Sequence, residues 1–113
     1  MKTNTIKLKS LNLEIWRHNF NPDGETIMTV GNAIQDLKNL GDGWRLPSYI
    51  EMSIISSLMD IGILDDTPTN NNYWTSFEDP DLEGYYVVFS FKNKSFGSSV
   101  YNDKLYVRPV RTI

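Results

Sequence analysis

The apolar positions alternate near the N-terminus, where residues 11–16 read LNLEIW. Leu11, Leu13 and Ile15 fall on one side of an extended chain, and Glu14 falls on the other. A repeat of two residues is typical of a half-buried β-strand. The segment is therefore predicted to form a strand.

The repeat changes to that of a helix after Thr29. Thr29 is a residue type that starts helices well, and Gly41 is one that ends them. Between them, four apolar residues recur at the spacing of one helix face: Val30, Ala33, Ile34 and Leu37. These signals predict a helix between Thr29 and Gly41.

The stretch GDGWRLPSYIEM, residues 41–52, leads into a second predicted helix. Ser48 and Glu51 have the spacing of a capping box, in which each side chain accepts a hydrogen bond from the other residue's backbone amide. Pro47 favours an extended backbone just before it, so the chain is expected to turn sharply here. The helix is predicted to end at Gly62, after a broad apolar face made of Ile54, Ile55, Leu58, Met59 and Ile61.

The rest of the chain has the pattern of β-structure. After a polar loop, strands are predicted over residues 73–77, 85–91, 96–101 and 105–111. One strand, two helices and then several strands make an α+β plan. With 113 residues, the chain has the length of a single domain spanning 1–113.

Charge and composition exclude several classes of protein. The net charge is −3, which argues against a general nucleic-acid binder, because such a protein needs a basic face. The absence of cysteine excludes disulfides, thiol nucleophiles and cysteine-bound metals. His18 is the single histidine, which rules out a multi-histidine metal site.

The sequence gives no sign of membrane insertion, because no apolar run approaches the roughly 18 residues of a membrane span. The first residues also lack the apolar centre of a secretory signal. We therefore expect a cytoplasmic protein if the chain natively begins at Met1, and a cell-surface or secreted protein if a leader was removed.

Residues 41–52 resemble a Gly-x-x-Trp-Arg-Leu-Pro-[Ser/Thr]-x-x-Glu motif found in two bacterial families. One is the domain at the C-terminus of bacterial collagen-like adhesins. The other, more distant, is the formylglycine-generating, sulfatase-modifying superfamily. YWTS at 73–76 and YVRPVR at 106–111 resemble later motifs of the first family in the same order. The resemblance covers about residues 27–113.

This resemblance implies a C-type-lectin-like fold, in which two helices pack beside a twisted, mostly antiparallel sheet. It does not imply an activity, because one fold serves many functions. The catalytic members of the superfamily use cysteines, so formylglycine-type oxidation is excluded for a chain without them. Many adhesin-type members also carry a cysteine in the first helix, where this chain has residues such as Asp36.

The shared motif is expected to build the fold rather than to bind a ligand. The capping box fixes the local geometry, so Trp44 and Leu46 are predicted core residues and Pro47 sets the turn. Arg45 is expected to pair with a carboxylate or to bind backbone carbonyls.

Two arginines near the C-terminus, Arg108 and Arg111, are expected on opposite faces of a strand. We expect one to be exposed and the other to be buried in an ion pair, with Glu51 as the suggested partner. An anion-binding role is the alternative, because guanidinium groups suit carboxylates and sulfates. Pro109 has no amide donor, which predicts an edge position or a bulge.

A calcium site is the metal hypothesis that the sequence allows. The stretch FEDPDLEG supplies four acidic residues: Glu78, Asp79, Asp81 and Glu83. Calcium takes six to eight oxygen ligands, and closely spaced carboxylates supply several of them. The alternative is an ordinary solvated acidic loop. No other cofactor is expected.

Aromatic residues beside carboxamides predict a sugar-binding surface, because aromatic rings stack on the apolar faces of pyranoses. The candidate ligand-binding residues are Tyr101, Asn102, Trp74, Asn72 and Tyr85, with Asn70 and Asn71 nearby. Trp74 also has an interpretation as a core residue, since aromatic residues within strands normally pack inside.

These observations predict a non-catalytic recognition module whose ligand is a glycan or another protein, contacted through the loops between residues 64 and 105. The sequence contains no recognisable nucleophile–base pair and no Gly-rich phosphate loop. The alternative is an interaction or structural subunit, such as a phage or mobile-element product, with no small-molecule ligand.

Overall fold

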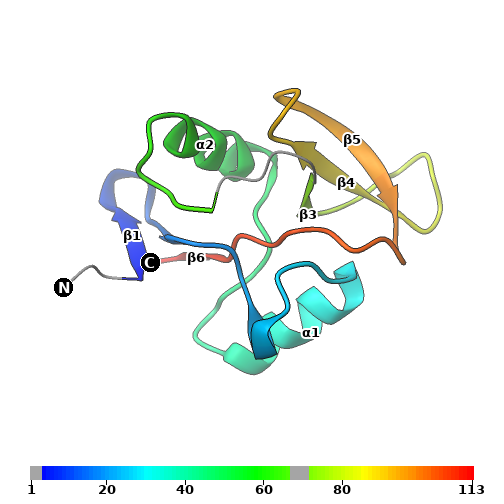
Figure 1. Cartoon of the computed structure of the whole chain (residues 1–113), viewed down its shortest axis with the longest axis horizontal. Helices are drawn as coiled ribbons and strands as arrows, with labels where there is room; N and C mark the ends of the chain where they lie inside the picture. The colour runs from blue at the N-terminus through cyan, green and yellow to red at the C-terminus, as the bar shows by residue number, and fades with distance from the viewer. Residues whose placement is uncertain (1–3, 67–71) are drawn as a thin grey trace.

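The computed structural model describes residues 4–66 and 72–113 as two helices and two three-stranded antiparallel sheets (Figure 1). The predicted α+β class is therefore confirmed. The elements are, in chain order, β1 (Thr5–Leu8), β2 (Leu13–Trp16), α1 (Val30–Leu40), α2 (Tyr49–Asp60), β3 (Asn72–Glu78), β4 (Tyr85–Ser90), β5 (Ser95–Val100) and β6 (Val110–Thr112).

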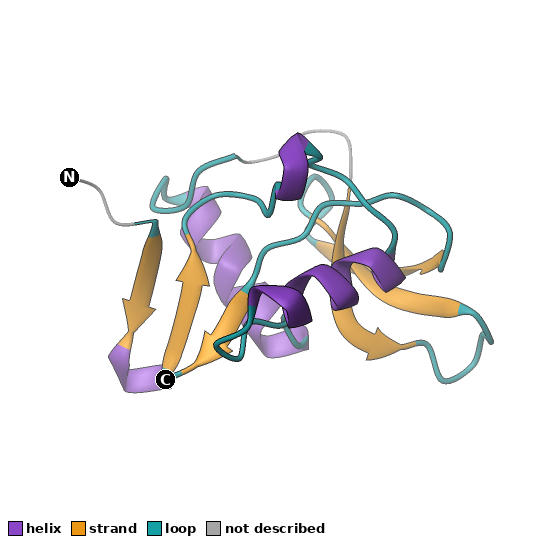
Figure 2. Ribbon diagram, turned by 90° about the horizontal axis from the view of Figure 1, so that it is seen from below, coloured by secondary structure: helices purple, strands orange, loops and turns teal. Residues whose placement is uncertain are grey.

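The two sheets lie at opposite ends of the molecule, with the helices between them (Figures 1 and 2). One sheet has the strand order β1-β2-β6, and the other has the order β3-β4-β5. In the first sheet Ile15 pairs with Val110, so segments from the two ends of the chain meet. In the second, β4 and β5 pair over six consecutive residues.

Both helices begin and end close to the predicted residues. The Thr29 side chain accepts a hydrogen bond from the Asn32 amide, and Gly41 is the C-terminal cap of α1. At α2 the capping box is complete: Ser48 Oγ accepts from the Glu51 amide at 3.3 Å, and Glu51 Oε1 accepts from the Ser48 amide at 2.9 Å. No helix in the described part of the chain is long and apolar enough to cross a membrane.

A buried extended segment, residues 105–110, runs through the middle of the molecule and separates two apolar clusters. Val107 lies in the cluster that α1 covers, together with Trp74 and Val88. Val110 lies in the cluster that α2 covers, together with Tyr73. The two sides of β3 and β4 therefore face different helices.

The structure differs from the predicted strands at both ends of the chain. The strand β1 was not predicted, and Leu11 is exposed within a 3-10 turn instead of lying in a strand. Near the C-terminus, only Val110–Thr112 forms a regular strand within the predicted range 105–111. Pro109 has no amide to donate, and its carbonyl accepts from the Trp16 amide just before β6 begins.

The predicted ion pair between a C-terminal arginine and Glu51 is wrong. Arg111 pairs with the buried Glu14, through a hydrogen bond from Nε to Oε1 of 2.7 Å. Burial alone would raise the pKa of Glu14, but hydrogen bonds from Thr5 and Arg111 outweigh it and lower the pKa. The β2–β6 pairing sets this partnership, because Glu14 and Arg111 lie opposite each other.

Glu51 pairs instead with Arg45 from its own motif, which confirms the carboxylate partner expected for Arg45. Nη1 and Nη2 of Arg45 donate to the two carboxylate oxygens of Glu51, at 2.7 and 2.9 Å. Nη1 also donates to the Leu46 carbonyl at 3.3 Å. One carboxylate thus closes the capping box and holds the arginine.

This dual role makes Glu51 a source of pH-dependent stability. Hydrogen bonding from Arg45 is the main cause that lowers the pKa of Glu51 below its ordinary value of 4.5. A carboxyl with a lowered folded-state pKa stabilises the protein above pH 4.5, and that stability is lost as the pH falls through the folded-state pKa. We expect Glu51→Gln to cost about 1–2 kcal/mol of unfolding free energy at pH 7.

Urea unfolding of the wild type and of Glu51→Gln at pH 7 and at pH 3.5 measures this effect. The difference between the two proteins should shrink at the lower pH. Glu83→Gln is the control, because Glu83 is exposed in a loop. An unchanged difference at both pH values would contradict the assignment.

Candidate functional site

The predicted ligand-binding residues do not come together on one surface. Tyr85 and Tyr101 lie close together, since Tyr85 pairs with Val100 and the Tyr101 amide donates to the Gly84 carbonyl at 2.9 Å. Asn72 pairs with Ser90 at the other end of β4. Asn102 is exposed in the turn after β5, whereas Asn70 and Asn71 lie outside the described residues.

Trp74 is a core residue and not a ligand platform. Its side chain is 0% exposed, and Nε1 donates to the Met28 carbonyl at 2.8 Å. Its ring packs edge-to-face on Tyr86 at 6.2 Å. The ligand-binding assignment for Trp74 is therefore wrong. The ring packs on the side of the sheet that α1 covers, and it has no exposed area to offer a ligand.

The four acidic residues of the predicted calcium loop do not form a metal site. No group of three acidic or other metal-binding side chains lies close enough within the described residues to hold an ion. Glu78 accepts a hydrogen bond from the Tyr86 hydroxyl, whereas Asp79 accepts from Ser98 and from the Asp81 amide. Glu83 is exposed. Asp79 and Asp81 lie close to each other, but no third carboxylate joins them.

An aromatic patch that the sequence analysis did not single out lies beside this loop. It consists of Tyr49, Phe77 and Phe96, which remain 40%, 44% and 38% exposed. The ring centroid of Tyr49 lies 4.9 Å from that of Phe77 and 4.8 Å from that of Phe96. Three rings from α2, β3 and β5 therefore form one continuous surface.

An irregularity in β3 brings these rings together. The β3–β4 register shifts between Trp74 and Glu78. Within this stretch, the Ser76 amide donates to the Pro47 carbonyl at 2.9 Å. The bond draws the end of β3 toward the start of α2, where Tyr49 is the first helical residue. Residues 44–47 (WRLP), which we call the WRLP turn, thus hold Tyr49 and Phe77 near each other.

A polar hollow of about 300 Å³ adjoins the aromatic patch. Its lining combines two rings of the patch, Tyr49 and Phe96, with Asp79, Asp81 and Ser98. The Ser98 hydroxyl donates to Asp79 Oδ2, and the Asp81 amide donates to Oδ1 at 2.8 Å. These bonds, with Ser98 contributing most, lower the pKa of Asp79 and fix its carboxylate at the edge of the rings.

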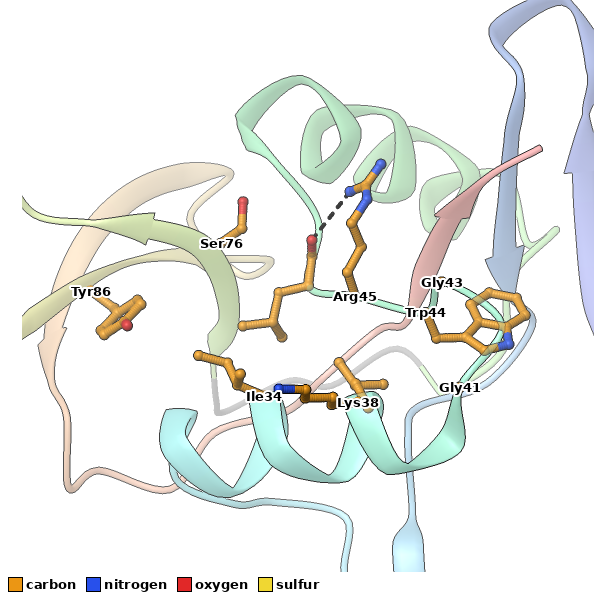
Figure 3. A pocket seen from close by; sticks show the side chains of 10 residues that line it. Ile34, Lys38, Gly41, Gly43, Trp44, Arg45, Ser76 and Tyr86 are labelled. Carbon is orange, nitrogen blue, oxygen red and sulfur yellow. Dashed lines mark hydrogen bonds between the residues drawn. The ribbon is translucent and has the colours of Figure 1, made fainter.

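A second, apolar pocket lies between α1, the WRLP turn, β3 and β4 (Figure 3). We call it the α1 pocket; its volume is about 410 Å³, and it is lined by Ile34, Leu37, Lys38, Gly41, Gly43, Trp44, Arg45, Leu46, Ser76 and Tyr86. Leu46 is buried as predicted, whereas Trp44 is only half-buried. The Arg111 guanidinium lies 4.7 Å from the Trp44 ring centroid and covers one of its faces.

One of the two C-terminal arginines was expected to be buried, and Arg108 is. The expected carboxylate partner is absent, because Arg108 forms no ion pair among the described residues. Nη1 donates to the Trp16 carbonyl at 3.3 Å, and Nη2 donates to the Asp65 carbonyl at 2.6 Å. Its contacts with the protein backbone identify it as a structural residue.

Comparison with solved structures identifies the fold. The chain superposes on the crystal structure of botrocetin with a TM-score of 0.67 and 11% identity, covering 100% of this chain and 99% of that one. A chain of the complex between a von Willebrand factor A1 domain mutant (I546V) and botrocetin gives a TM-score of 0.64 and 12% identity, with the same coverage. The fold is therefore C-type-lectin-like, as the sequence resemblance implied.

No protein-family model matches the chain, and no curated protein sequence matches it. At 11–12% identity, the structural likeness establishes the fold alone. The function has to be argued from the surfaces described above.

Proposed function

We propose that the protein is a non-catalytic recognition module that binds a glycan on the aromatic patch and in the polar hollow beside it. The observation that carries this proposal is the placement of Asp79 next to the exposed rings of Tyr49 and Phe96. The contact surface lies within the loop-rich half of the chain, except for Tyr49 at the start of α2.

The chemistry of the two surfaces is complementary to a pyranose. Exposed rings offer flat apolar area for the C–H face of a sugar. An ionised carboxylate accepts hydrogen bonds from sugar hydroxyls, and such charge-assisted bonds are stronger than neutral ones. Asp79 is already held by Ser98 and the Asp81 amide, so binding would require little reorganisation.

The Tyr49 ring is the centre of the patch, so its removal should weaken glycan binding most. We expect Tyr49→Ala to reduce the affinity for a bound oligosaccharide by about fivefold, because a ring contact is worth roughly 1 kcal/mol. Isothermal titration calorimetry of the wild type and the variant measures the change. Asp79→Asn should weaken binding too, since it removes the charged acceptor.

Tyr101→Ala is the matched control, because Tyr101 is 60% exposed and lies outside the patch. It should leave the affinity unchanged. Loss of binding in Tyr101→Ala with full binding in Tyr49→Ala would contradict the proposed surface and favour one around Tyr85 and Tyr101.

A protein partner is the second candidate, favoured by the open edge of β5. Residues 95–100 (SFGSSV) carry no charge and no proline, and β5 is the outer strand of its sheet. Such an edge offers unpaired backbone groups to another strand. The likeness to a chain from the von Willebrand factor A1–botrocetin complex is compatible with a role in binding proteins.

We expect this edge to support self-association if the second candidate is right. Gly97→Lys places a charge on the edge strand, where a Cβ atom meets no neighbour within 4 Å. Light scattering after gel filtration should then show a wild-type oligomer that Gly97→Lys converts to a monomer. Gly31→Lys on α1 is the matched control, since its Cβ position is equally open. A monomeric wild type would count against self-association.

We also propose a family relationship that is narrower than the shared fold. The GDGWRLPSYIEM, YWTS and YVRPVR motifs support kinship with the C-terminal domains of bacterial collagen-like adhesins. The structure gives the first motif a physical role, because its residues close the capping box and bind the end of β3.

A further inference from the structure

The α1 pocket differs from the aromatic patch in its chemistry. Leu37 and Leu46 are almost fully buried and form its apolar base, while Ile34 remains 45% exposed on α1. Figure 3 shows the side chains of Ile34 and Lys38 on the side of α1 that borders the pocket, with the Lys38 nitrogen next to Ile34. A volume of about 410 Å³ lies within the usual range for small-molecule sites.

The pocket has few polar groups, and most of them are already engaged. Arg45 is held by Glu51, and the Tyr86 hydroxyl donates to Glu78 at 3.3 Å. Lys38 forms no ion pair within the described part of the chain. The lysine therefore supplies an uncompensated positive charge beside an apolar surface.

We propose that the α1 pocket is a second ligand site, which takes a small molecule with an apolar body and one carboxylate. The body would lie against Ile34, Leu37 and Leu46, where it removes apolar surface from water. The carboxylate would pair with the Lys38 ammonium at the exposed side of the pocket. This site is distinct from the aromatic patch and its polar hollow, because they share no lining residue.

A pair of probes separates the apolar contribution from the charge. 3-Phenylpropionate carries the carboxylate, and 3-phenylpropan-1-ol has nearly the same shape without it. Titration into ¹⁵N-labelled protein should give saturable amide shifts for residues 34–46 and for Ser76. We expect the acid to bind about fivefold more tightly than the alcohol, since a partly exposed ion pair contributes up to about 1 kcal/mol.

Two substitutions on the exposed surface of α1 complete the test. Lys38→Met should reduce the affinity for the acid to that for the alcohol, while Lys92→Met, at an exposed lysine after β4, should change neither. Ile34→Glu should abolish binding of the acid, because it removes an apolar wall and adds a negative charge.

Three results would overturn the proposal. They are the absence of saturable shifts around the pocket, equal affinities of the wild type for the acid and the alcohol, and full binding of the acid by Lys38→Met. None of them bears on glycan binding at the aromatic patch.

Discussion

Replacing Arg108 by methionine is expected to lower the free energy of unfolding by about 3 kcal/mol, because buried acceptors that lose their donor each cost about 1–3 kcal/mol. The side chain is fully buried and donates to the carbonyls of Trp16 and Asp65. A third, longer bond of 3.4 Å reaches the Tyr73 hydroxyl. Arg108 thus links the end of β2 and the loop after α2 to β3 in the second sheet.

Methionine keeps much of the volume of arginine, so the substitution tests the hydrogen bonds more than the packing. Arg108→Lys should have an intermediate effect, because one ammonium group cannot reach all three acceptors. Urea unfolding measures both variants, with Lys104→Met as an exposed control. If Arg108→Met matched or exceeded the wild type in stability, the cost of burying the charge would outweigh its hydrogen bonds.

Replacing Trp74 by alanine is expected to cost about 4 kcal/mol, as is usual when a large aromatic side chain is removed from a core. Trp74 packs in the α1 cluster beside Val88 and Val107, and its indole holds the Met28 carbonyl. Trp74→Phe should cost about half as much, because it keeps part of the ring and loses the hydrogen bond.

The same unfolding experiment distinguishes the two interpretations of Trp74. Tyr101→Ala serves as the control and should change stability by less than about 0.5 kcal/mol, as exposed substitutions do. A small effect of Trp74→Ala would contradict the core assignment. The result also bears on ligand binding, since a fully buried ring has no face to offer a sugar.

The helices were predictable because their signals are local. Thr29, Gly41 and the Ser48–Glu51 box act within one turn of the residues that they cap, so the sequence contains both partners. The partner of Arg45 is Glu51, which is only six residues away. A carboxylate partner for Arg45 was expected from the sequence. The partner of Arg111 is Glu14, which is 97 residues away and depends on the β2–β6 pairing.

The aromatic patch could not be assembled from the sequence for a similar reason. Tyr49, Phe77 and Phe96 come from three elements, and the shift of register in β3 decides that they meet. The alternating pattern of strands marks Phe77 and Phe96 as apolar positions without showing that they stay exposed. Trp74 was placed among the ligand residues because it lies beside the loop-rich half of the chain, near Asn72 in the region of the sequence rich in asparagine, although its ring is buried in the core.

Arg108 illustrates a limit of polarity patterns. One of Arg108 and Arg111 was expected to be buried in an ion pair, because charged side chains are rarely buried without a partner. Here the partners are mainly backbone carbonyls of distant segments, which leave no trace in the sequence.

The measurement that tests the central claim most directly is a glycan-array screen of the purified chain, run once with calcium and once with EDTA. We expect binding that EDTA does not alter, because the described carboxylates do not converge on a metal site. We also expect Tyr49→Ala to lose the same glycans. An array that stays blank, or glycans that Tyr49→Ala still retains, would contradict the account.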